Sequence, residues 1–258
     1  MYRSRIIPCL LIQNRGLVKT VKFKSPVYVG DPVNAIKIFN EKEVDELVLL
    51  DIKASELGVE PDYELIAEVA GECFMPVCYG GGIRNLEQAK RIFSSGIEKI
   101  SLNSAAIEEP NLIRRIADIY GSQSVVVSID CKKSIFGKYS VMTRSGTKNM
   151  KLDPAEWAVT VEGAGAGEIF LNSIDRDGTM RGYDIDLVKA VTSVVSIPVI
   201  ACGGAGSLQD LVEPIDLAGA SAVAAGSLFV FHGKRKAVLI NYPSPVLTRE
   251  IFAPKEIK

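Results

Sequence analysis

An internal repeat that spans nearly half of the chain limits the possible folds more than any other feature. The stretch DELVLLDI at 45–52 resembles GEIFLNSI at 167–174, and MPVCYGGGIRN, which starts at 75, resembles IPVIACGGAGS, which starts at 197. At a constant offset of 123, three pairs of glycines match: Gly80 with Gly203, Gly81 with Gly204, and Gly96 with Gly219. A duplication on this scale predicts two similar structural halves.

Short, almost wholly apolar runs alternate with longer amphipathic segments. The runs predict strands at 5–11, 46–51, 76–80, 98–102, 124–130, 167–172, 197–202 and 221–225. Continuous apolar runs such as VVVSI are typical of strands that are covered on both faces, as in a parallel sheet flanked by helices. The segments between them have helix signals, with Asp31 before Pro32 in one and Asn85 before a run that ends at Gly96 in another.

This alternation fits a (β/α)₈ barrel, since eight strand–helix units in 258 residues match the size of that fold. A doubly wound open sheet would alternate in the same way. The repeat favours the barrel, built from two half-barrels at about 1–120 and 121–240. No linker is visible near the middle of the chain, so a single domain over 1–258 is expected.

Composition excludes several classes of protein. The 30 basic and 31 acidic residues give a net charge of −1, which offers no general attraction for nucleic acid or membranes. The first residues lack the features of a secretory signal, and no apolar run is long enough to span a bilayer. The five cysteines are scattered and form no CxxC pair. These features predict a cytoplasmic protein with reduced thiols and without metal or cofactor.

Two segments interrupt the regular alternation. Residues 13–30 form a long connection that carries Lys19, Lys22 and Lys24, and residues 131–151 are predicted to add a hairpin with Gly137 at its turn. In a barrel of this kind the loops after strands lie on the catalytic face. Long loops there are typical of lids and binding elements.

Two glycine-rich turns point to phosphate binding. CYGGGIRN at 78–85 and ACGGAGS at 201–207 each follow a strand, and glycine allows backbone N–H groups to approach an anion closely. A tight turn also needs glycine, but the duplication favours binding. The residues expected in the two cradles are Gly81, Gly82, Asn103 and Ser104 on one side, and Gly203, Gly204, Gly226 and Ser227 on the other. Opposite cradles indicate a substrate with a phosphate at each end.

Further polar residues follow two other strands. In LNSIDRDGT, the residues Asp177, Gly178 and Thr179 are predicted to complete a phosphate cradle or to hold sugar hydroxyls, unless this is a solvated loop. Asp130 ends the apolar strand VVVSID. A partly desolvated carboxyl at that position would have a raised pKa and could act as a general acid or base. Neutralisation by the two lysines that follow is the alternative.

Charged residues also stand at the beginnings of four strands: Arg5, Glu46, Lys99 and Glu168. Two of each sign could ring the barrel axis. Charges at this end of a barrel are more often solvated or paired for stability, and the residues alone favour that interpretation.

The strings RIIPCL, DELVLLDI, YGGGIRN, SLNSAAI, VVVSIDCK, GAGEIFLNSIDRDGT, GYD and ACGGAG together resemble the cyclase subunit of imidazole glycerol phosphate synthase, a family of histidine biosynthesis. The match runs from Arg5 to about Phe231, and the tail HGKRKAVLINYPSPVLTREIFAPKEIK fits poorly. The resemblance implies a glutaminase partner on the amino-terminal face and ammonia passing through the barrel. At the opposite mouth, a bis-phosphorylated phosphoribulosyl substrate would become imidazole glycerol phosphate and an aminoimidazole ribotide.

The resemblance also implies roles for individual residues. It makes Arg5, Glu46, Lys99 and Glu168 an ammonia gate, which revises the interpretation above. It supports the phosphate cradles and adds Lys19, which would reach the substrate, and Asp51.

One expected catalytic residue is missing. The family uses two aspartates, at the ends of the first and fifth strands, and Asp130 matches the second, but Leu11 stands at the place of the first. The internal repeat agrees, because IIPCLL aligned on VVVSID puts Leu11 opposite Asp130. Proton transfer from two directions is then impaired, so slow or absent cyclase turnover is expected. Milder departures from the family are Thr20, Asn172 and Cys202.

Two other functions follow from related families. Relatives that work with a sugar amidotransferase in surface polysaccharide synthesis are similar in lacking the first aspartate, and such a chain would conduct ammonia between two partners. A phosphosugar isomerase of the sister histidine-pathway type shares the half-barrel repeat. It also requires the first aspartate, and the strings RIIPCL and DRDGT favour the cyclase side.

Overall fold

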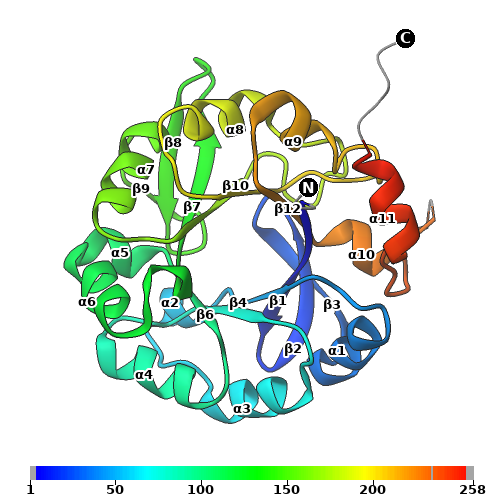
Figure 1. Cartoon of the computed structure of the whole chain (residues 1–258), viewed down its shortest axis with the longest axis horizontal. Helices are drawn as coiled ribbons and strands as arrows, with labels where there is room; N and C mark the ends of the chain where they lie inside the picture. Colours follow the sequence, from blue (N-terminus) through cyan, green and yellow to red (C-terminus); the bar gives the residue numbers. More distant parts are fainter. Residues whose placement is uncertain (1–3, 234, 254–258) are drawn as a thin grey trace.

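Eight parallel strands close into a barrel in the computed structural model, which describes residues 4–233 and 235–253 (Figure 1). The two ends of the predicted domain, 1–3 and 254–258, lie outside the described residues. The barrel strands are β1 (Arg5–Gln13), β4 (Leu47–Asp51), β5 (Val77–Gly80), β6 (Lys99–Leu102), β7 (Val125–Lys133), β10 (Glu168–Ser173), β11 (Val199–Cys202) and β12 (Ala222–Ala225). They pair in chain order, and β12 returns to β1. The (β/α)₈ prediction is confirmed, and the halfway boundary near residue 120 stays a prediction.

Helices surround the barrel. The longer ones are α1 (Pro32–Glu41), α3 (Tyr63–Glu72), α4 (Leu86–Ser94), α6 (Asn111–Tyr120), α7 (Pro154–Gly163), α8 (Ile185–Thr192), α9 (Glu213–Ala218) and α11 (Pro245–Ile251). Short helical turns are α2 (Ala54–Leu57), α5 (Ser104–Glu108), η1 (Ser122–Ser124) and α10 (Ser227–Val230). The predicted caps are present, since Asp31 accepts from the amide of Asn34 and Asn85 from that of Gln88, each at 2.9 Å.

Each half of the barrel begins with a strand that continues into an antiparallel hairpin. β7 continues into β8 (Tyr139–Thr143) and β9 (Lys148–Asn149), and Gly137 lies in the first turn with φ 80°, as predicted. β1 continues into β2 (Gly16–Val21) and β3 (Lys24–Gly30), where the sequence predicted only a long connection. The turn between β2 and β3 has positive φ at Lys22 and Phe23, 55° and 59°. Such a turn normally uses glycine or asparagine, so these residues carry no hairpin signal.

The strand register shows how the two halves correspond. Leu11, Leu50 and Gly80 are partners across β1, β4 and β5. Asp130, Asn172 and Cys202 are partners in the same way across β7, β10 and β11. Leu11 and Asp130 both face the inside of the barrel mouth, which supports the correspondence of these two positions.

The predicted offset of 123 is wrong for the glycine turns, where the strand register gives an offset one residue shorter. Gly81, with φ 124°, corresponds to Gly203, with φ 92°, and not to Gly204. The three glycines in a row at 80–82 permit either alignment in the sequence, which explains the error.

Apolar side chains fill two concentric regions. An outer core lies between the strands and the helices, and a smaller cluster inside the barrel includes Ile7, Val48, Val126, Phe170 and Ile200. The tail that fits the family poorly packs on the barrel, because the hydroxyl of Tyr242 donates to the carbonyl of Ile6 at 2.9 Å. No helix within the described residues is long and apolar enough to cross a membrane.

Candidate functional site

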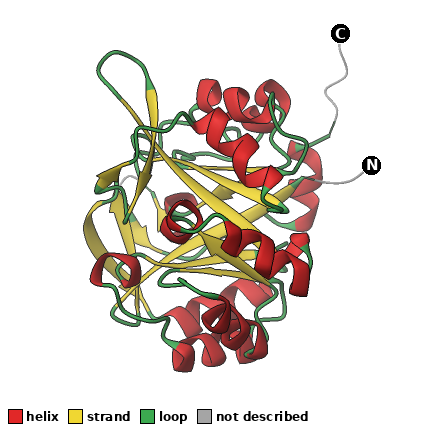
Figure 2. Ribbon diagram, turned by 90° about the vertical axis from the view of Figure 1, so that its left-hand side faces the viewer, coloured by secondary structure: helices red, strands yellow, loops and turns green. Residues whose placement is uncertain are grey.

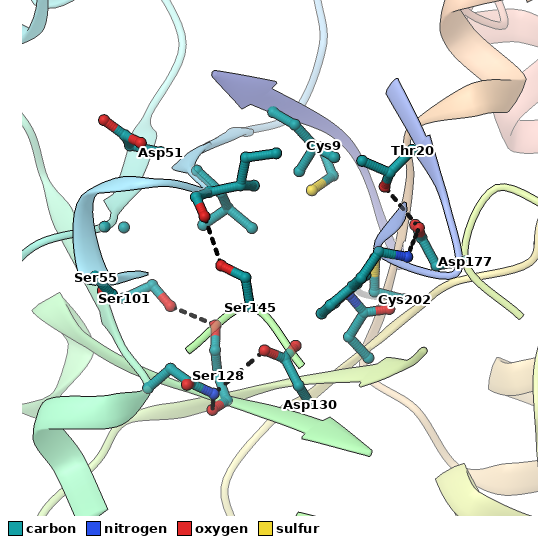
Figure 3. Close-up of a pocket in the computed structure, with 18 of the residues that line it drawn as sticks. Cys9, Thr20, Asp51, Ser55, Ser101, Ser128, Asp130, Ser145, Asp177 and Cys202 are labelled. Atoms are coloured by element: carbon teal, nitrogen blue, oxygen red, sulfur yellow. Dashed lines mark hydrogen bonds between the residues drawn. The ribbon is translucent and has the colours of Figure 1, made fainter. Parts of the chain in front are cut away.

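A cavity of about 390 Å³ opens at the carboxyl ends of the barrel strands (Figure 3). Nearly all the residues predicted for this mouth line it: Lys19, Asp51, Gly81, Gly82, Asn103, Ser104, Asp130, Asp177, Gly178, Gly203, Gly204, Gly226 and Ser227. Thr179 does not, and its predicted ligand role stays a prediction. Its hydroxyl donates to the carbonyl of Arg176 at 2.7 Å, because the DRDG turn folds back on itself. The cavity residues come from both halves of the chain.

The two predicted cradles lie across the mouth from each other. One is at the ends of β5 and β6 and the other at the ends of β11 and β12, and two barrel strands separate them on either side. Both have a close backbone approach. A Cβ on Gly81 would lie 2.5 Å from the carbonyl oxygen of Asp51, and one on Gly203 would lie 2.8 Å from that of Ser173. Glycine is therefore required sterically at both turns, and phosphate binding there stays a prediction.

Asp130 is the carboxyl group at the end of β7. Burial raises its pKa to about 7, and the nearby charge of Asp177 adds to the increase. The side-chain amide of Asn103 donates to the carboxylate at 3.3 Å and to the carbonyl of Ser128 at 3.0 Å. A carboxyl group with a pKa near neutrality can both take up and release a proton.

Leu11 occupies the corresponding position on β1. Its half-buried side chain lines the cavity and packs with Leu50 against the apolar cluster inside the barrel. This side of the mouth therefore has an apolar wall where the other side has Asp130.

Asp177 holds the β2–β3 hairpin over the mouth. Its carboxylate accepts from the hydroxyl of Thr20 at 2.9 Å and from the amide of Phe23 at 3.3 Å, and its carbonyl accepts from the amide of Lys22 at 2.9 Å. Burial raises the pKa of Asp177, while the bond from Thr20 opposes the increase. The sequence predicted a ligand role for this residue, and the structure adds a contact that fixes the hairpin.

Lys19 and Asp51 are also held by backbone contacts. Lys19 lies on β2 and is buried, and its ammonium donates to the carbonyl of Cys9 at 2.6 Å. Burial lowers the pKa of Lys19. A Cβ on Gly226 would lie 2.3 Å from the Lys19 nitrogen, so this amine is at the edge of the second cradle. Asp51 accepts from the amides of Lys53 and Ala54 at 2.9 and 3.0 Å.

At the opposite end of the barrel, the four predicted charges form a closed ring. Arg5 bonds Glu46 and Glu168, each at 2.5 Å, and Lys99 bonds the same two carboxylates at 3.0 and 2.8 Å. Burial lowers the pKa of Arg5 and of Lys99, but the two carboxylates raise it by more. The pKa of both basic groups is therefore raised. The possibility that these residues surround the axis is therefore confirmed, and gating of ammonia stays a prediction.

Several cavity residues were not predicted from the sequence. The hydroxyls of Ser101 and Ser128 share a hydrogen bond of 2.6 Å, and Ser145 donates to the carbonyl of Ile52 at 2.5 Å (Figure 3). Both Ser101 and Ser128 precede a predicted site residue by two positions, so strand alternation could have revealed them. Ser145 lies in the turn between β8 and β9, and no local signal marks it. Among residues 4–233 and 235–253, no group of three or more acidic, histidine or cysteine residues is arranged to hold a metal ion.

The sequence profile of the histidine biosynthesis protein family matches residues 5–236. The chain belongs to this family. A Pseudomonas aeruginosa protein named "Putative imidazole glycerol phosphate synthase subunit hisF2" is 66% identical over 243 residues, which are 94% of this chain and 97% of that protein.

Other members of the histidine biosynthesis protein family are similar over most of their length. A Vibrio vulnificus protein with the same name but the ending hisF3 is 55% identical and covers 95% of each chain. The Chlorobium luteolum "Imidazole glycerol phosphate synthase subunit HisF" is 44% identical, over 92% of this chain and 95% of its own. The predicted resemblance to subunits of this synthase is confirmed.

Proposed function

We propose that the chain is the cyclase-type subunit of an imidazole glycerol phosphate synthase. Ammonia from a glutaminase on the amino-terminal face would pass the ring of charges and follow the barrel axis to the mouth. There a bis-phosphorylated phosphoribulosyl substrate would give imidazole glycerol phosphate and an aminoimidazole ribotide. The observation that carries the proposal is that the charged ring and Asp130 stand at opposite ends of one closed barrel.

The mouth suits a substrate with two anionic ends. The cradles on opposite sides would each hold a phosphate, and the Lys19 ammonium would pair with the one next to Gly226. Asp130, with its pKa of about 7, would exchange protons with the reacting centre between them. Asn103 would keep the carboxyl group in place through its hydrogen bond.

Leu11 sets the expected rate. The reaction needs proton transfers from two directions, and Leu11 provides neither a donor nor an acceptor on its side of the cavity. Since a positioned acid or base typically contributes a factor of about 10² to 10⁴, turnover without it should be slow by a comparable amount.

Steady-state turnover of the purified chain with ammonium chloride and the phosphoribulosyl substrate tests this proposal. We expect a low rate of product formation by the native chain. The rate should be at least about 100-fold lower in Asp130→Asn and about 100-fold or more higher in Leu11→Asp. Leu11→Asn, which is similar in size to aspartate but has no ionisable carboxyl group, is the matched control and should show no gain. Absence of turnover in both the native chain and Leu11→Asp would contradict the proposed cyclase activity.

A second function is favoured by one observation, the apolar wall that Leu11 and Leu50 form in the mouth. In this proposal the barrel has no cyclase reaction of its own and conducts ammonia from the glutaminase to a sugar amidotransferase of surface polysaccharide synthesis.

A three-protein assay separates the two functions. If the chain is a conduit, glutamine hydrolysis rises only when the glutaminase, this chain and the amidotransferase are mixed, and the sugar is amidated. Stimulation by the phosphoribulosyl substrate without the third protein would instead support the cyclase. Genes for nucleotide-sugar enzymes beside the gene of this chain would favour the conduit, and histidine genes would favour the cyclase.

A further inference from the structure

The turn between β7 and β8 presents two large apolar side chains to solvent. Ile135 is 95% exposed and Phe136 is 91% exposed, the highest values for large hydrophobic residues in the described part of the chain. Neighbouring exposed apolar side chains at a projecting turn are typical of an interaction site. Residues 132–139 are called the arm below, and Figure 2 shows the hairpin projecting at the top, away from the helices.

The arm has a fixed conformation. The amide of Ser134 donates to the carbonyl of Lys138 at 2.8 Å, and the amide of Gly137 donates back to Ser134 at 2.9 Å. Its base is anchored to the barrel, because the amide of Lys133 donates to Asp175 at 2.8 Å and the hydroxyl of Tyr139 donates to Asp184 at 2.7 Å. A turn that is already ordered loses little entropy when a partner binds it.

The charged residues within the segment that contains the arm have one sign. No acidic residue occurs between 131 and 152, and the basic residues of that segment are Lys132, Lys133, Lys138, Arg144, Lys148 and Lys151. The whole chain has a net charge of −1, so this positive charge is a local concentration. An apolar pocket with a rim of carboxylates would complement both the tip and its lysines.

The other hairpin is an internal comparison. Its tip also carries a phenylalanine, but Phe23 lines the cavity and is half-buried. A Cβ on Gly146 would lie 3.0 Å from the Phe23 ring, so this phenylalanine has contacts within the protein. A hairpin of this kind can therefore fold its tip inward, and packing inside the chain does not explain the exposed pair at Ile135 and Phe136.

We propose that the arm docks into another protein, whose surface has an apolar pocket rimmed by carboxylates. A flat anionic membrane fits less well, since Asp175 and Asp184 at the base of the arm would meet it too. The arm extends from the carboxyl end of β7, whereas the charged ring lies at the other end of the barrel. A partner on the arm and a glutaminase on the amino-terminal face would not compete. The proposal does not depend on which reaction occurs in the mouth.

Site-specific photocrosslinking in the native host identifies the partner. A benzoylphenylalanine at position 136 should crosslink to one other protein, in a peptide with apolar residues flanked by aspartate or glutamate. The control position is Ile119, which is 54% exposed on α6 and should give no such product. Crosslinks only between copies of this chain, only to lipid, or to nothing would overturn the proposal.

Titration of the identified protein with the full-length chain then tests the chemistry. We expect Phe136→Ser and the double change Lys132→Glu with Lys133→Glu each to raise Kd at least tenfold, and Ile119→Ser to leave it unchanged. Reversing the partner's rim carboxylates to lysine should restore binding of the Glu double variant. An unchanged Kd for both the Phe136→Ser variant and the Glu double variant would contradict protein docking. Equal binding of all variants to phosphatidylglycerol vesicles would also contradict it. Circular dichroism should show every variant folded, because the altered side chains are exposed.

Discussion

The two halves of the barrel share one backbone plan but have specialised at opposite ends. At the amino-terminal end, Glu46 and Glu168 occupy corresponding positions, so both halves supply a carboxylate. The cations come from the first half alone. In the second half, the position that corresponds to Arg5 is Ser124, and the position that corresponds to Lys99 is Ala222. At the mouth the situation is reversed, since the second half has Asp130 and the first has Leu11.

The hairpins differ in the same way. The first turns Phe23 inward and is fixed by Asp177, whereas the second extends Phe136 into solvent. The comparison teaches that a shared backbone did not preserve symmetrical chemistry. A side chain near the barrel axis can reach the whole cavity. One of the two halves is therefore enough to supply it, and the corresponding residue of the other half is free to change.

The ring of charges should give the largest effect on stability. Glu46→Ala leaves Arg5 and Lys99 with one carboxylate in a largely buried site, so we expect a loss of about 3–5 kcal/mol in the free energy of unfolding. Urea denaturation measures it. Glu109→Ala, which breaks an exposed pair with Arg115, is the control and should cost at most about 1 kcal/mol. Equal losses in both variants would mean that the ring contributes no more than a surface pair.

Asp130 should make stability depend on pH in a way that Leu11 cannot. The folded-state pKa of Asp130, about 7, lies above its ordinary value of 3.8, so folding favours the protonated form. Stability from this group is complete below pH 3.8 and is lost as the pH rises through 7, by about 2–4 kcal/mol.

Asp130→Asn should remove that loss. We expect the variant to be more stable than the native chain at pH 8 and similar to it at pH 4, measured by urea unfolding at both values. Asp118→Asn, at an exposed position on α6, is the control and should leave the pH dependence unchanged. A native chain as stable at pH 8 as at pH 4 would contradict the raised pKa.

The two hairpin tips should respond differently to the same substitution. Phe23→Ser removes contacts of a half-buried ring, so we expect a loss of about 1–2 kcal/mol and faster proteolysis within residues 16–30. Phe136→Ser should change stability by less than about 0.5 kcal/mol, because the ring is 91% exposed. Similar losses at both tips would show that Phe136 supports the fold.

The strands and the repeat were predictable because burial on both faces leaves a local trace, the short apolar run. Asp130 was predictable for a related reason, since a carboxyl at the end of such a run must lie at the barrel mouth. The β2–β3 hairpin was not, because the Lys22–Phe23 turn adopts positive φ without glycine or asparagine.

Other features depend on residues far apart in the chain. The bond of Thr20 to Asp177 joins positions 157 residues apart, and no sequence window contains both. The hydroxyl of Thr179 depends instead on a contact within its own turn. This residue stands in a motif that looks like a ligand loop, but a hydrogen bond within the turn directs its hydroxyl to the backbone. The charged ring was visible as four residues at strand starts, and only the closed register shows that they meet.

The contact between the tail and the first strand has a consequence for synthesis of the protein. Tyr242 bonds the carbonyl of Ile6, and β1 pairs with β12, so the first strand lacks one neighbour until β12 has been synthesised. The barrel therefore cannot close before β12 and Tyr242 have left the ribosome. Until then the edge of β1 is open to pairing with other chains, and its protection during translation becomes a requirement for yield.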